Sequence, residues 1–469
     1  MSVPDSGGRF DLIVVGGGPA GYVGAIRGAQ LGLRTALVER EKLGGTCLHV
    51  GCIPTKVLLH TAELLEAMRA GAEMGIQASG VALDYGQVRR RMDRVVTTNF
   101  RGVEFLMRKH GIAVFAGDGR LLGPTRVRVA ATDGSELILE GRHILVATGS
   151  RPRTVPGVVI DNHRVLDNAG ALRLPAIPRS LAILGAGAVG TEFASLFTAF
   201  GAAVTLIEMM PAILPLEDED VSAVVAHELG RRGVAIRTGT AVTGVAASAD
   251  GVRIGVRDGA VEETIEAEYA LVAVGRAPVI EDLGLEAVGL EPRRGGIPVD
   301  GRMRTAVPSV WAAGDVIGGL LLAHVASAEA TVAVEAIAGQ EPRGLDPMLM
   351  PRATYSIPQV ACCGLTEREA REQGREVAVG RFPFTANARA AILGRREGFV
   401  KIVADRTLGE ILGIHMVGSE VTELLPEGVL GKALEATVLE IGQAVHAHPT
   451  LSEAVKEAAL AALGRAVHG

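Results

Sequence analysis

The chain is poor in cysteine and in aromatic residues. Only four of its 469 residues are cysteines, and aromatic residues make up 3%. Four cysteines are too few for the dense disulfide framework of small secreted domains. Two of them, Cys362 and Cys363, are adjacent in a strand-like run from 354 to 364, and we expect them to be structural. The apolar run from Leu12 to Val15 is too short for a secretory signal, so we expect a cytoplasmic protein.

Positive charge is not in excess either. The formal net charge of −6 argues against a protein that binds nucleic acid regardless of sequence. The run Arg89-Arg90-Arg91 falls on an expected amphipathic helix, from Tyr85 to His110, and we interpret it as a solvated face. No apolar stretch approaches the ~20 residues of a membrane span, so no membrane partner is expected. The length and the 48% of hydrophobic residues are compatible with about two to four domains.

The other two cysteines, Cys47 and Cys52, lie five residues apart at an expected helix start. In a regular helix this spacing separates the Cα atoms by about 8–9 Å, whereas a disulfide needs about 4.4–6.8 Å. Either the two residues are unpaired, buried thiols, or Gly51 and Pro54 loosen the helix enough for them to pair. A strained disulfide at a helix start would be easily reduced, and the helix dipole would stabilise its thiolates.

A complete dinucleotide-binding unit precedes these cysteines. An apolar strand at 11–15 runs into the glycine-rich loop Gly16-x-Gly18-x-x-Gly21, a helix follows to about residue 31, and a second strand at 35–38 ends at Glu39. The glycines let the backbone approach a pyrophosphate at the helix N-terminus, and the acid can accept hydrogen bonds from ribose hydroxyls. The whole pattern is far more specific than its glycines alone.

The same unit occurs a second time. A strand at 180–184 leads into Gly185-x-Gly187-x-x-Gly190, and a strand at 204–207 ends at Glu208. Both acids follow the first glycine of their loop by 23 residues (16 to 39 and 185 to 208). Two such units imply two dinucleotides, one with a flavin and one with a nicotinamide.

Glu208 also predicts which nicotinamide dinucleotide is bound. A carboxylate at this position accepts from a ribose 2′-hydroxyl and repels a 2′-phosphate. Met209 and Met210 follow it, so no arginine is placed to receive that phosphate. The sequence therefore predicts NAD rather than NADP.

Two further segments are compatible with a flavin site. Residues 144–149 form an expected strand that ends in a turn of small residues, Thr148 and Gly149 among them. Residues 310–315 form another that ends at Asp315. This acid could bind a ribityl hydroxyl, or it could simply cap a helix that begins at Val316.

Near the C-terminus, His448 is followed by Pro449, which favours a loop at the histidine. We expect Thr450 to open a helix that runs to about residue 463, with Glu453 completing a capping box. Glu453 could instead orient and charge His448, whose usual pKa suits a base for a thiol substrate. His446 is interpreted as a neighbour without a catalytic role.

Taken together, these motifs resemble the flavoprotein pyridine nucleotide-disulfide oxidoreductases. Residues 44–56 and 446–453 look most similar to the dihydrolipoamide dehydrogenase branch, and the resemblance covers roughly residues 10–463. It implies an α/β fold with two Rossmann-like domains and an α+β C-terminal dimerisation domain. The implied boundaries are 1–150 with 277–346 for a discontinuous FAD-binding domain, 151–276 for NAD, and 347–469 for dimerisation.

The resemblance also implies roles for single residues. Cys47 and Cys52 would form a redox-active disulfide, in which Cys47 exchanges with the substrate and Cys52 faces the flavin. His448 and Glu453 would serve the active site of the opposite subunit of a homodimer. The remaining implied cofactor contacts are Lys56 paired with Glu192, Gly119, Thr148, Gly149, Asp315 and Ala323 at FAD, and Val242 and Gly275 at NAD. No metal site is implied.

The implied reaction is the oxidation of protein-bound dihydrolipoamide to lipoamide, with electrons passing through the disulfide and FAD to NAD⁺. The partner would be a lipoylated acyltransferase or another lipoyl-carrying protein of a multienzyme complex. The alternatives are another FAD-dependent disulfide reductase, of the glutathione or mercuric type, or mainly a docking subunit of a 2-oxoacid dehydrogenase complex. The chain departs from the family pattern at several positions: His49, Val279, Ser356 and Gln359.

Overall fold

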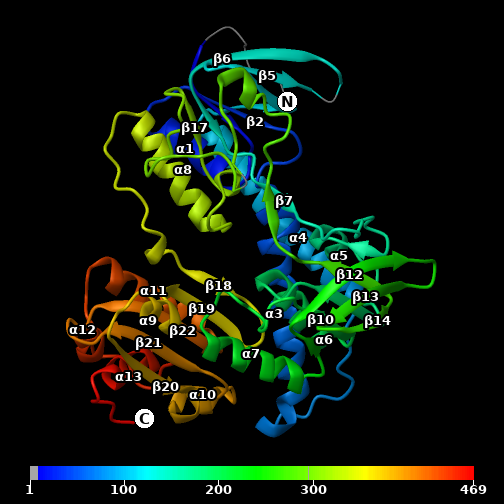
Figure 1. Ribbon diagram of the computed structural model, residues 1–469, viewed down its shortest axis with the longest axis vertical. Helices are drawn as coiled ribbons and strands as arrows, with labels where there is room; N and C mark the ends of the chain where they lie inside the picture. The colour runs from blue at the N-terminus through cyan, green and yellow to red at the C-terminus, as the bar shows by residue number, and fades with distance from the viewer. Residues whose placement is uncertain (1–8, 132, 294, 469) are drawn as a thin grey trace. The chain divides into compact units, whose positions relative to one another are not determined.

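The computed structural model describes residues 9–131, 133–293 and 295–468. The chain divides into two compact units (Figure 1). Unit 1 comprises the residues up to Val57, with 89–153 and 276–345, and unit 2 comprises 58–88, 154–275 and the residues from 346 onward. Helices α3 (Cys52–Arg69) and α4 (Tyr85–Lys109) each contribute residues to both units. The expected division into three domains remains a prediction.

Unit 1 is built around a seven-stranded sheet of order β3-β2-β1-β6-β5-β4, with β17 beside β6. The pairs β1–β2, β2–β3, β1–β6 and β6–β17 are parallel. The near-continuous apolar run of β1 is typical of parallel strands that are covered on both faces. The strands are β1 (Phe10–Val15), β2 (Thr35–Glu39), β3 (Ala113–Ala116), β4 (Asp118–Gly123), β5 (Arg126–Ala130), β6 (Glu136–Val146) and β17 (Val310–Ala312), with the separate antiparallel pair β7 (Ser150–Pro152) and β16 (Arg276–Pro278).

Two helices of small residues lie side by side against this sheet, α1 (Pro19–Gln30) and α8 (Ala323–Ile337) (Figure 1). A Cβ on Gly24 would lie 3.3 Å from the Cβ of Ala330, so the glycine lets the helices approach closely. Arg27 and Glu335 join them by an ion pair of 2.6 Å. The unit also contains α2 (Gly45–Val50), most of α4, and the 3₁₀-helices η2 (Leu285–Val288) and η3 (Asp315–Ile317).

Unit 2 holds a second parallel sheet, of order β11-β10-β9-β15-β8, and an antiparallel sheet, β12-β13-β14. The expected strands at 180–184 and 204–207 are β9 and β10, the latter one residue longer at its start. The strands are β8 (Val165–Leu166), β9 (Ser180–Leu184), β10 (Ala203–Ile207), β11 (Ala235–Arg237), β12 (Thr240–Ala247), β13 (Val252–Asp258), β14 (Val261–Ala267) and β15 (Tyr269–Val272), and the helices are η1 (Ala70–Met74), α5 (Asn168–Leu172), α6 (Ala188–Phe200) and α7 (Glu219–Arg231).

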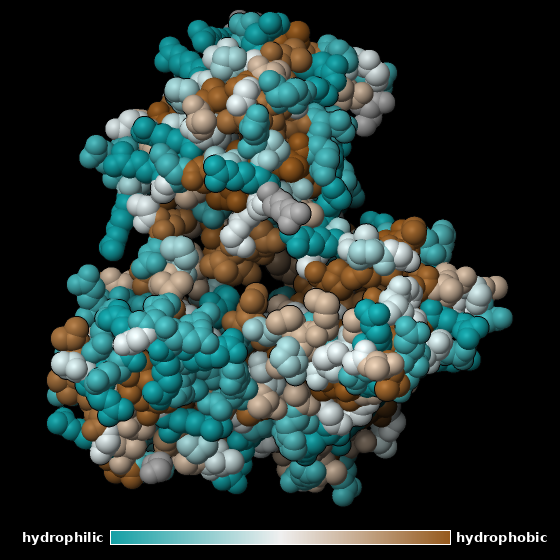
Figure 2. All heavy atoms as spheres, in the orientation of Figure 1, coloured by the Kyte–Doolittle hydropathy of each residue, from teal (hydrophilic) through white to brown (hydrophobic). Residues whose placement is uncertain are grey.

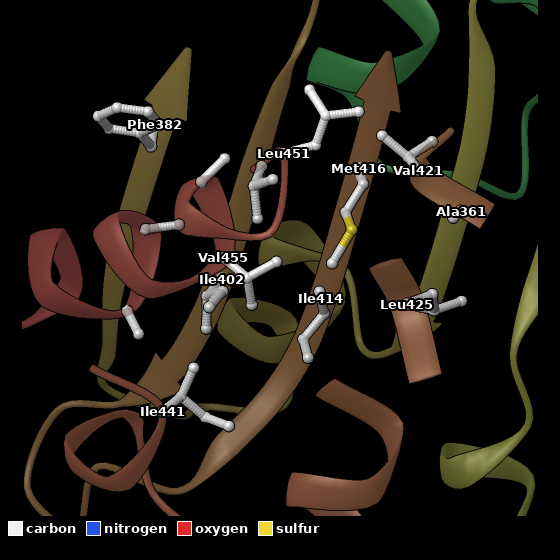
Figure 3. Packing of buried hydrophobic residues seen from close by; sticks show 14 of the residues in the cluster. Ala361, Phe382, Ile402, Ile414, Met416, Val421, Leu425, Ile441, Leu451 and Val455 are labelled. Atoms are coloured by element: carbon white, nitrogen blue, oxygen red, sulfur yellow. The ribbon is translucent and has the colours of Figure 1, made fainter. Parts of the chain in front are cut away.

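A third sheet of unit 2, of order β18-β19-β22-β21-β20, is antiparallel throughout. Side chains of this sheet and of helix α13, among them Ile402, Ile414 and Val455, gather in one buried cluster (Figure 3). The elements are η4 (Pro347–Leu349), β18 (Arg352–Thr354), β19 (Gln359–Gly364), α9 (Glu367–Glu372), β20 (Val377–Pro383), η5 (Phe384–Ala386), α10 (Ala388–Leu393), β21 (Phe399–Asp405), β22 (Ile411–Gly418), α11 (Val421–Ala433), α12 (Val438–Gln443) and α13 (Glu453–Ala462).

The turn from Asp405 to Gly409 joins β21 to β22 as a hairpin. The single strand expected at 354–364 is instead two, because a turn separates β18 from β19. Cys362 and Cys363 are free and fully buried in β19, as expected of structural residues. Across the described ranges, we find no helix with the length and apolar character that a membrane span requires.

A buried charge cluster joins α7 to the third sheet. The Nζ atom of Lys401 lies 3.0 Å from a carboxylate oxygen of Asp218, 2.7 Å from one of Asp220 and 2.9 Å from one of Glu367. Burial alone would lower the pKa of Lys401, but these carboxylates outweigh it and raise that pKa. The cluster helps to make the second parallel sheet and the C-terminal sheet one compact unit.

Candidate functional site

The helix expected at the first cysteine pair is broken between the two cysteines. Helix α2 ends at Val50 and α3 begins at Cys52, with Gly51 between them at φ −135° and ψ −116°. A Cβ on Gly51 would lie 2.8 Å from the carbonyl oxygen of Thr46. This close approach is how the chain draws Cys52 toward Cys47. Pro54 lies in the first turn of α3 and has no N–H to bond back to the Val50 carbonyl, which is compatible with the expected loosening of the helix at Gly51.

We predict that Gly51→Ala destabilises the protein by about 1–3 kcal/mol, because the added methyl group has no space beside the Thr46 carbonyl. Gly102→Ala in α4 is the matched control, since a Cβ there meets nothing within 4 Å. That variant should gain about 0.5–1 kcal/mol from the loss of a helical glycine. Urea unfolding of both variants measures the effect, and an equal stability of the two would contradict the close-approach explanation.

The two cysteines of the pair are half-buried and in contact through their side chains. The hydrogen bond to the Cys52 side chain raises the pKa of Cys47 far above its usual value, and burial raises it further, while the charge of Lys56 opposes both. The expectation that the helix dipole stabilises these thiolates stays a prediction.

Two further side chains lie near the pair: Tyr22, which no sequence motif indicates, and His49, which the sequence marks only as a departure from the family pattern. The pKa of Tyr22 in α1 is raised by burial and then by the charge of Cys47, which places the phenol in the electrostatic environment of that sulfur. The Nε2 atom of His49 lies 2.8 Å from the Leu43 carbonyl oxygen, and its ring packs on Phe100 with centroids 5.4 Å apart. His49, a departure from the family pattern, thus holds the loop before the cysteines in place.

The first glycine-rich loop has the geometry of a dinucleotide cradle. Gly16 has φ +106°, and a Cβ there would lie 2.3 Å from the Ala147 carbonyl oxygen. A Cβ on Gly21 would lie 1.8 Å from the Gly16 carbonyl oxygen. Gly18 is the N-cap of α1 without a side-chain cap, and a Cβ there would meet nothing within 4 Å. Two glycines therefore permit the turn, and the third leaves the helix N-terminus accessible to a pyrophosphate.

Glu39 completes this cradle. Its Oε2 accepts the Gly17 N–H at 2.6 Å, and its Oε1 accepts the Glu41 N–H at 2.8 Å. A carboxylate has about four acceptor positions, so capacity remains for ribose hydroxyls. The residues present fit a bound dinucleotide.

The second glycine-rich loop has nearly the same backbone geometry and the same contacts to its acid. Gly185 has φ +99°, and a Cβ on Gly190 would lie 1.9 Å from the Gly185 carbonyl oxygen. Gly187 caps α6 as Gly18 caps α1, again with nothing within 4 Å of a Cβ. Glu208 accepts the Ala186 N–H at 2.7 Å and the Met210 N–H at 2.9 Å. This loop too fits a dinucleotide.

Asp315 does not cap a helix, so that interpretation is wrong. The N-cap of η3 is Gly314, without a side-chain bond, and the Asp315 carboxylate accepts the Ser150 hydroxyl instead. Arg276 donates from Nε to the Ser150 hydroxyl at 2.7 Å, and this Nε lies 3.9 Å from Asp315 Oδ2. The acid therefore stands beside a hydroxyl and a guanidinium at the carboxyl end of β17.

Thr148 and Gly149 form the neighbouring turn. The Thr148 hydroxyl donates to the Val279 carbonyl at 2.8 Å, and the Val279 N–H donates to the Gly149 carbonyl at 2.9 Å. Both bonds use the backbone of Val279, so they are independent of the side chain that departs from the family pattern.

The remaining residues with an implied cofactor contact lie in the following elements. Gly119 lies in β4, where a Cβ would come within 2.8 Å of Val15 Cγ1. Glu192 is buried in α6 and accepts the Tyr355 N–H at 2.9 Å. Its expected ion pair with Lys56 involves residues of different units and stays a prediction. Three more implied contacts are Ala323 at the start of α8, Val242 in β12, and Gly275 after β15 with φ +104°.

The other two departures from the family pattern are buried. The Ser356 hydroxyl donates to the Pro358 carbonyl at 2.7 Å, and the side-chain oxygen of Gln359 accepts the Thr422 hydroxyl at 2.9 Å. Both therefore serve local packing.

His448 and Glu453 form a hydrogen-bonded pair in a loop before α13. The Nδ1 atom of His448 lies 3.0 Å from Glu453 Oε1, and Glu453 Oε2 accepts the Thr450 N–H at 2.9 Å. Burial raises the pKa of Glu453, but the Thr450 N–H and the His448 ring outweigh it and lower that pKa. Since 72% of the His448 side chain is exposed, the ring can reach a substrate.

Helix α13 begins at Glu453, three residues later than expected. The Thr450 hydroxyl donates to the Ala447 carbonyl at 2.8 Å, so only the Glu453 half of the expected capping box is formed. His446 is engaged elsewhere, with Nε2 2.8 Å from Glu427 Oε1. Glu453 therefore both anchors Thr450 and orients His448. The cysteines belong to unit 1 and His448 to unit 2, and their expected meeting across a dimer stays a prediction.

Comparison with known proteins gives consistent matches over nearly the whole chain. Residues 10–330 match the family described as pyridine nucleotide-disulphide oxidoreductase, and residues 350–459 match the dimerisation domain of that family. The dihydrolipoyl dehydrogenase of Bacillus subtilis (strain 168) is 45% identical over 98% of this chain and 99% of its own length.

Two solved structures are also similar. LpdA from Mycobacterium tuberculosis has a TM-score of 0.90 at 29% identity, over 96% of this chain and 99% of that one. The HOCl-induced flavoprotein disulfide reductase RclA from Escherichia coli has a TM-score of 0.85 at 27% identity, also over 96% and 99%.

Proposed function

This chain belongs to the pyridine nucleotide-disulphide oxidoreductase family, and on that premise we propose that Cys47, Cys52 and His448 carry its chemistry. The chain is an enzyme that binds FAD and NAD and oxidises dihydrolipoamide to lipoamide. The observation that supports the residue assignment most strongly is the pair of thiols that the break at Gly51 draws into side-chain contact.

The proposed thiol chemistry starts from the oxidised pair. His448 takes the proton of one substrate thiol, and the resulting thiolate attacks the Cys47 sulfur. Cys52 leaves as a thiolate. The second substrate thiol then attacks the substrate sulfur of the mixed disulfide, the bond to Cys47 breaks, Cys47 takes up a proton, and the cyclic disulfide product is released. When bound, FAD supplies the two-electron chemistry between the thiol pair and NAD⁺.

The two cradles hold the cofactors. The loop at Gly16, with Glu39, would hold FAD, because Asp315 and the Thr148 turn lie in the same unit. The loop at Gly185, with Glu208, would hold NAD. Glu453 contributes by fixing the Nδ1 side of His448, which leaves Nε2 as the basic nitrogen.

The C-terminal segment supports a proposed homodimer in which His448 acts on the partner's thiol pair. Residues 350–459 match the dimerisation domain. In this segment, Leu430 is 60% exposed, Leu434 71% and Val445 95%. The face shown in Figure 2 is largely hydrophilic, with hydrophobic residues at several places. Apolar side chains this exposed, in the segment that matches the dimerisation domain, suit a surface that a second copy covers.

The proposed substrate carrier is a lipoylated acyltransferase or another lipoyl-carrying protein of a multienzyme complex, and the proposed location is the cytoplasm. The dihydrolipoyl dehydrogenases similar to this chain support the first proposal. A docking function would add to catalysis rather than replace it, because both cysteines, His448 and Glu453 are present.

Anaerobic titration of the purified holoenzyme with dihydrolipoamide tests the function. We expect one equivalent of dihydrolipoamide to reduce the holoenzyme. NADH should then form when NAD⁺ is added. Reduction by glutathione instead, with a preference for NADP, would favour the other reductase types. Binding to the acyltransferase without turnover would favour a docking subunit.

Glu208 gives a prediction about cofactor preference. Glu208→Gln removes the charge that repels a 2′-phosphate but keeps one acceptor for the loop N–H groups of Ala186 and Met210. We expect it to narrow the NAD over NADP preference in kcat/KM by about tenfold, equivalent to ~1.4 kcal/mol. Glu208→Ala should narrow the ratio similarly and also weaken NAD binding, because both loop bonds are lost. An unchanged ratio in both variants would remove Glu208 from cofactor selection.

A further inference from the structure

We propose that Glu329 is a positioning residue of the flavin site, which fixes the turn carrying Asp315 and couples the binding of FAD to the uptake of a proton. The proposal rests on the proposed function only in taking FAD as the dinucleotide of the first cradle. None of the motifs in the sequence points to this residue.

Glu329 is a buried acid in the middle of α8, with 8% of its surface exposed. Its Oε2 accepts the Gly314 N–H at 2.7 Å. Gly314 has φ +79° and ψ −163°, a conformation that favours glycine. The carboxyl group therefore holds the Ala313–Gly314 peptide, one residue before Asp315.

The turn is also confined on both sides. A Cβ on Gly314 would lie 3.0 Å from the Cβ of Ala20 in the first turn of α1 and 3.3 Å from the Cβ of Ala326 in α8. The first turn of α1 is where the pyrophosphate of a dinucleotide is expected to bind. Glu329 thus lies behind the two features that would meet FAD, the α1 N-terminus and Asp315. Through its bond to the Gly314 N–H, it positions the turn that carries Asp315.

The surroundings of this carboxyl group disfavour its ionised form. Burial raises the pKa of Glu329, the Gly314 N–H lowers it, and the neighbouring Asp315 carboxylate raises it, with a net value of about 7. Among the charged groups on the packed elements, Arg27 of α1 pairs with Glu335 of α8, and Arg276 lies beside Asp315. His324 is the remaining ionisable side chain of α8, and Tyr22 that of α1.

The direction of the coupling follows from these charges. FAD brings a pyrophosphate with two negative charges to the adjacent helix N-terminus, and this charge disfavours an ionised Glu329. Binding of FAD therefore favours the protonated acid, and the affinity for FAD falls as the pH rises through about 7. Each further unit by which FAD raises the pKa of Glu329 weakens FAD binding about tenfold across that range.

The test is the dissociation constant of FAD from the apoprotein at several values between pH 6 and pH 8.5, measured by flavin fluorescence. For the wild type, we expect the constant to rise about tenfold over this range. Glu329→Gln retains an acceptor for the Gly314 N–H but cannot titrate, so it should bind FAD with a nearly constant affinity. Glu329→Ala loses the acceptor and should bind FAD at least about tenfold more weakly at every pH, as expected for a lost buried hydrogen bond.

Glu335→Gln is the matched control, because Glu335 lies on the same helix but pairs with Arg27, and its pH dependence should equal that of the wild type. A Glu329→Gln protein that retains the wild-type pH dependence would refute the coupling. A Glu329→Ala protein with wild-type affinity would refute the positioning role. Failure of dihydrolipoamide to reduce a tightly bound flavin would count against the proposed function and leave these binding results unaffected.

Discussion

Replacement of Cys47 by serine is expected to abolish the oxidation of dihydrolipoamide while FAD stays bound. A serine hydroxyl cannot form the disulfide that the substrate thiolate attacks, so no mixed disulfide arises. The first cradle should be unaffected, because the bond of the Gly17 N–H to Glu39 and the close packing of Gly21 on Gly16 both lie outside α2. NADH formation from dihydrolipoamide and NAD⁺ measures the loss, and the flavin absorbance per chain reports cofactor retention.

Cys363→Ser is the control for this experiment. Cys363 is buried in β19, where its sulfur donates to the Met348 carbonyl at 3.4 Å, and a serine hydroxyl can make the same bond. We expect this variant to turn over normally. Normal turnover by the Cys47→Ser protein would remove Cys47 and Cys52 from the reaction and return them to the alternative of two buried thiols.

Replacement of His448 by glutamine should lower kcat/KM for dihydrolipoamide by at least about a hundredfold, in line with the usual contribution of a general base. The glutamine amide can still donate to Glu453 Oε1, so the loop should be retained, but it cannot accept the substrate proton. The loss should shrink when the assay pH is raised, because the substrate thiol then ionises without help. A pH profile of kcat/KM for both proteins is the measurement.

His446→Gln serves as the matched control, two residues away. His446 contacts Glu427 and the Ala444 carbonyl, so its replacement should leave kcat/KM within a few-fold of the wild type. If the two variants lose activity equally, the loop as a whole matters rather than the His448 base. A near-wild-type rate for His448→Gln would leave Glu453 with its structural role at Thr450 alone.

The elements around both glycine-rich loops could be predicted from the sequence to within about a residue. Strands β1, β2, β9 and β10 are short apolar runs that end at glycine or at an acid, so local pattern alone determines their bounds. The start of α13 was predicted three residues too early. Threonine is a common helix-capping residue, but the Thr450 hydroxyl donates to the Ala447 carbonyl instead. This loop contact cannot be predicted from the hydrophobic periodicity of the sequence.

The features of the candidate site could likewise be predicted from the sequence only where a local pattern marks them. The break between the cysteines could be predicted because Gly51 marks it, whereas the raised pKa of Cys47 could not. That pKa depends on the contact between two sulfurs rather than on the position of either one in a helix. Glu329 escaped prediction because its partner, the Gly314 N–H, lies 15 residues away and is a backbone group. The sequence pattern of α8 gives no sign of a polar contact at that point.

The two cradles carry a consequence for the history of the chain. Glu39 and Glu208 accept backbone N–H groups at corresponding positions of their loops, and the N-caps Gly18 and Gly187 have almost identical backbone angles, with φ −70° in both. Such agreement between segments 169 residues apart (16 to 185) is what duplication of one ancestral coding unit would leave behind. The residue just past the acid differs between the two units, Arg40 in one and Met209 in the other.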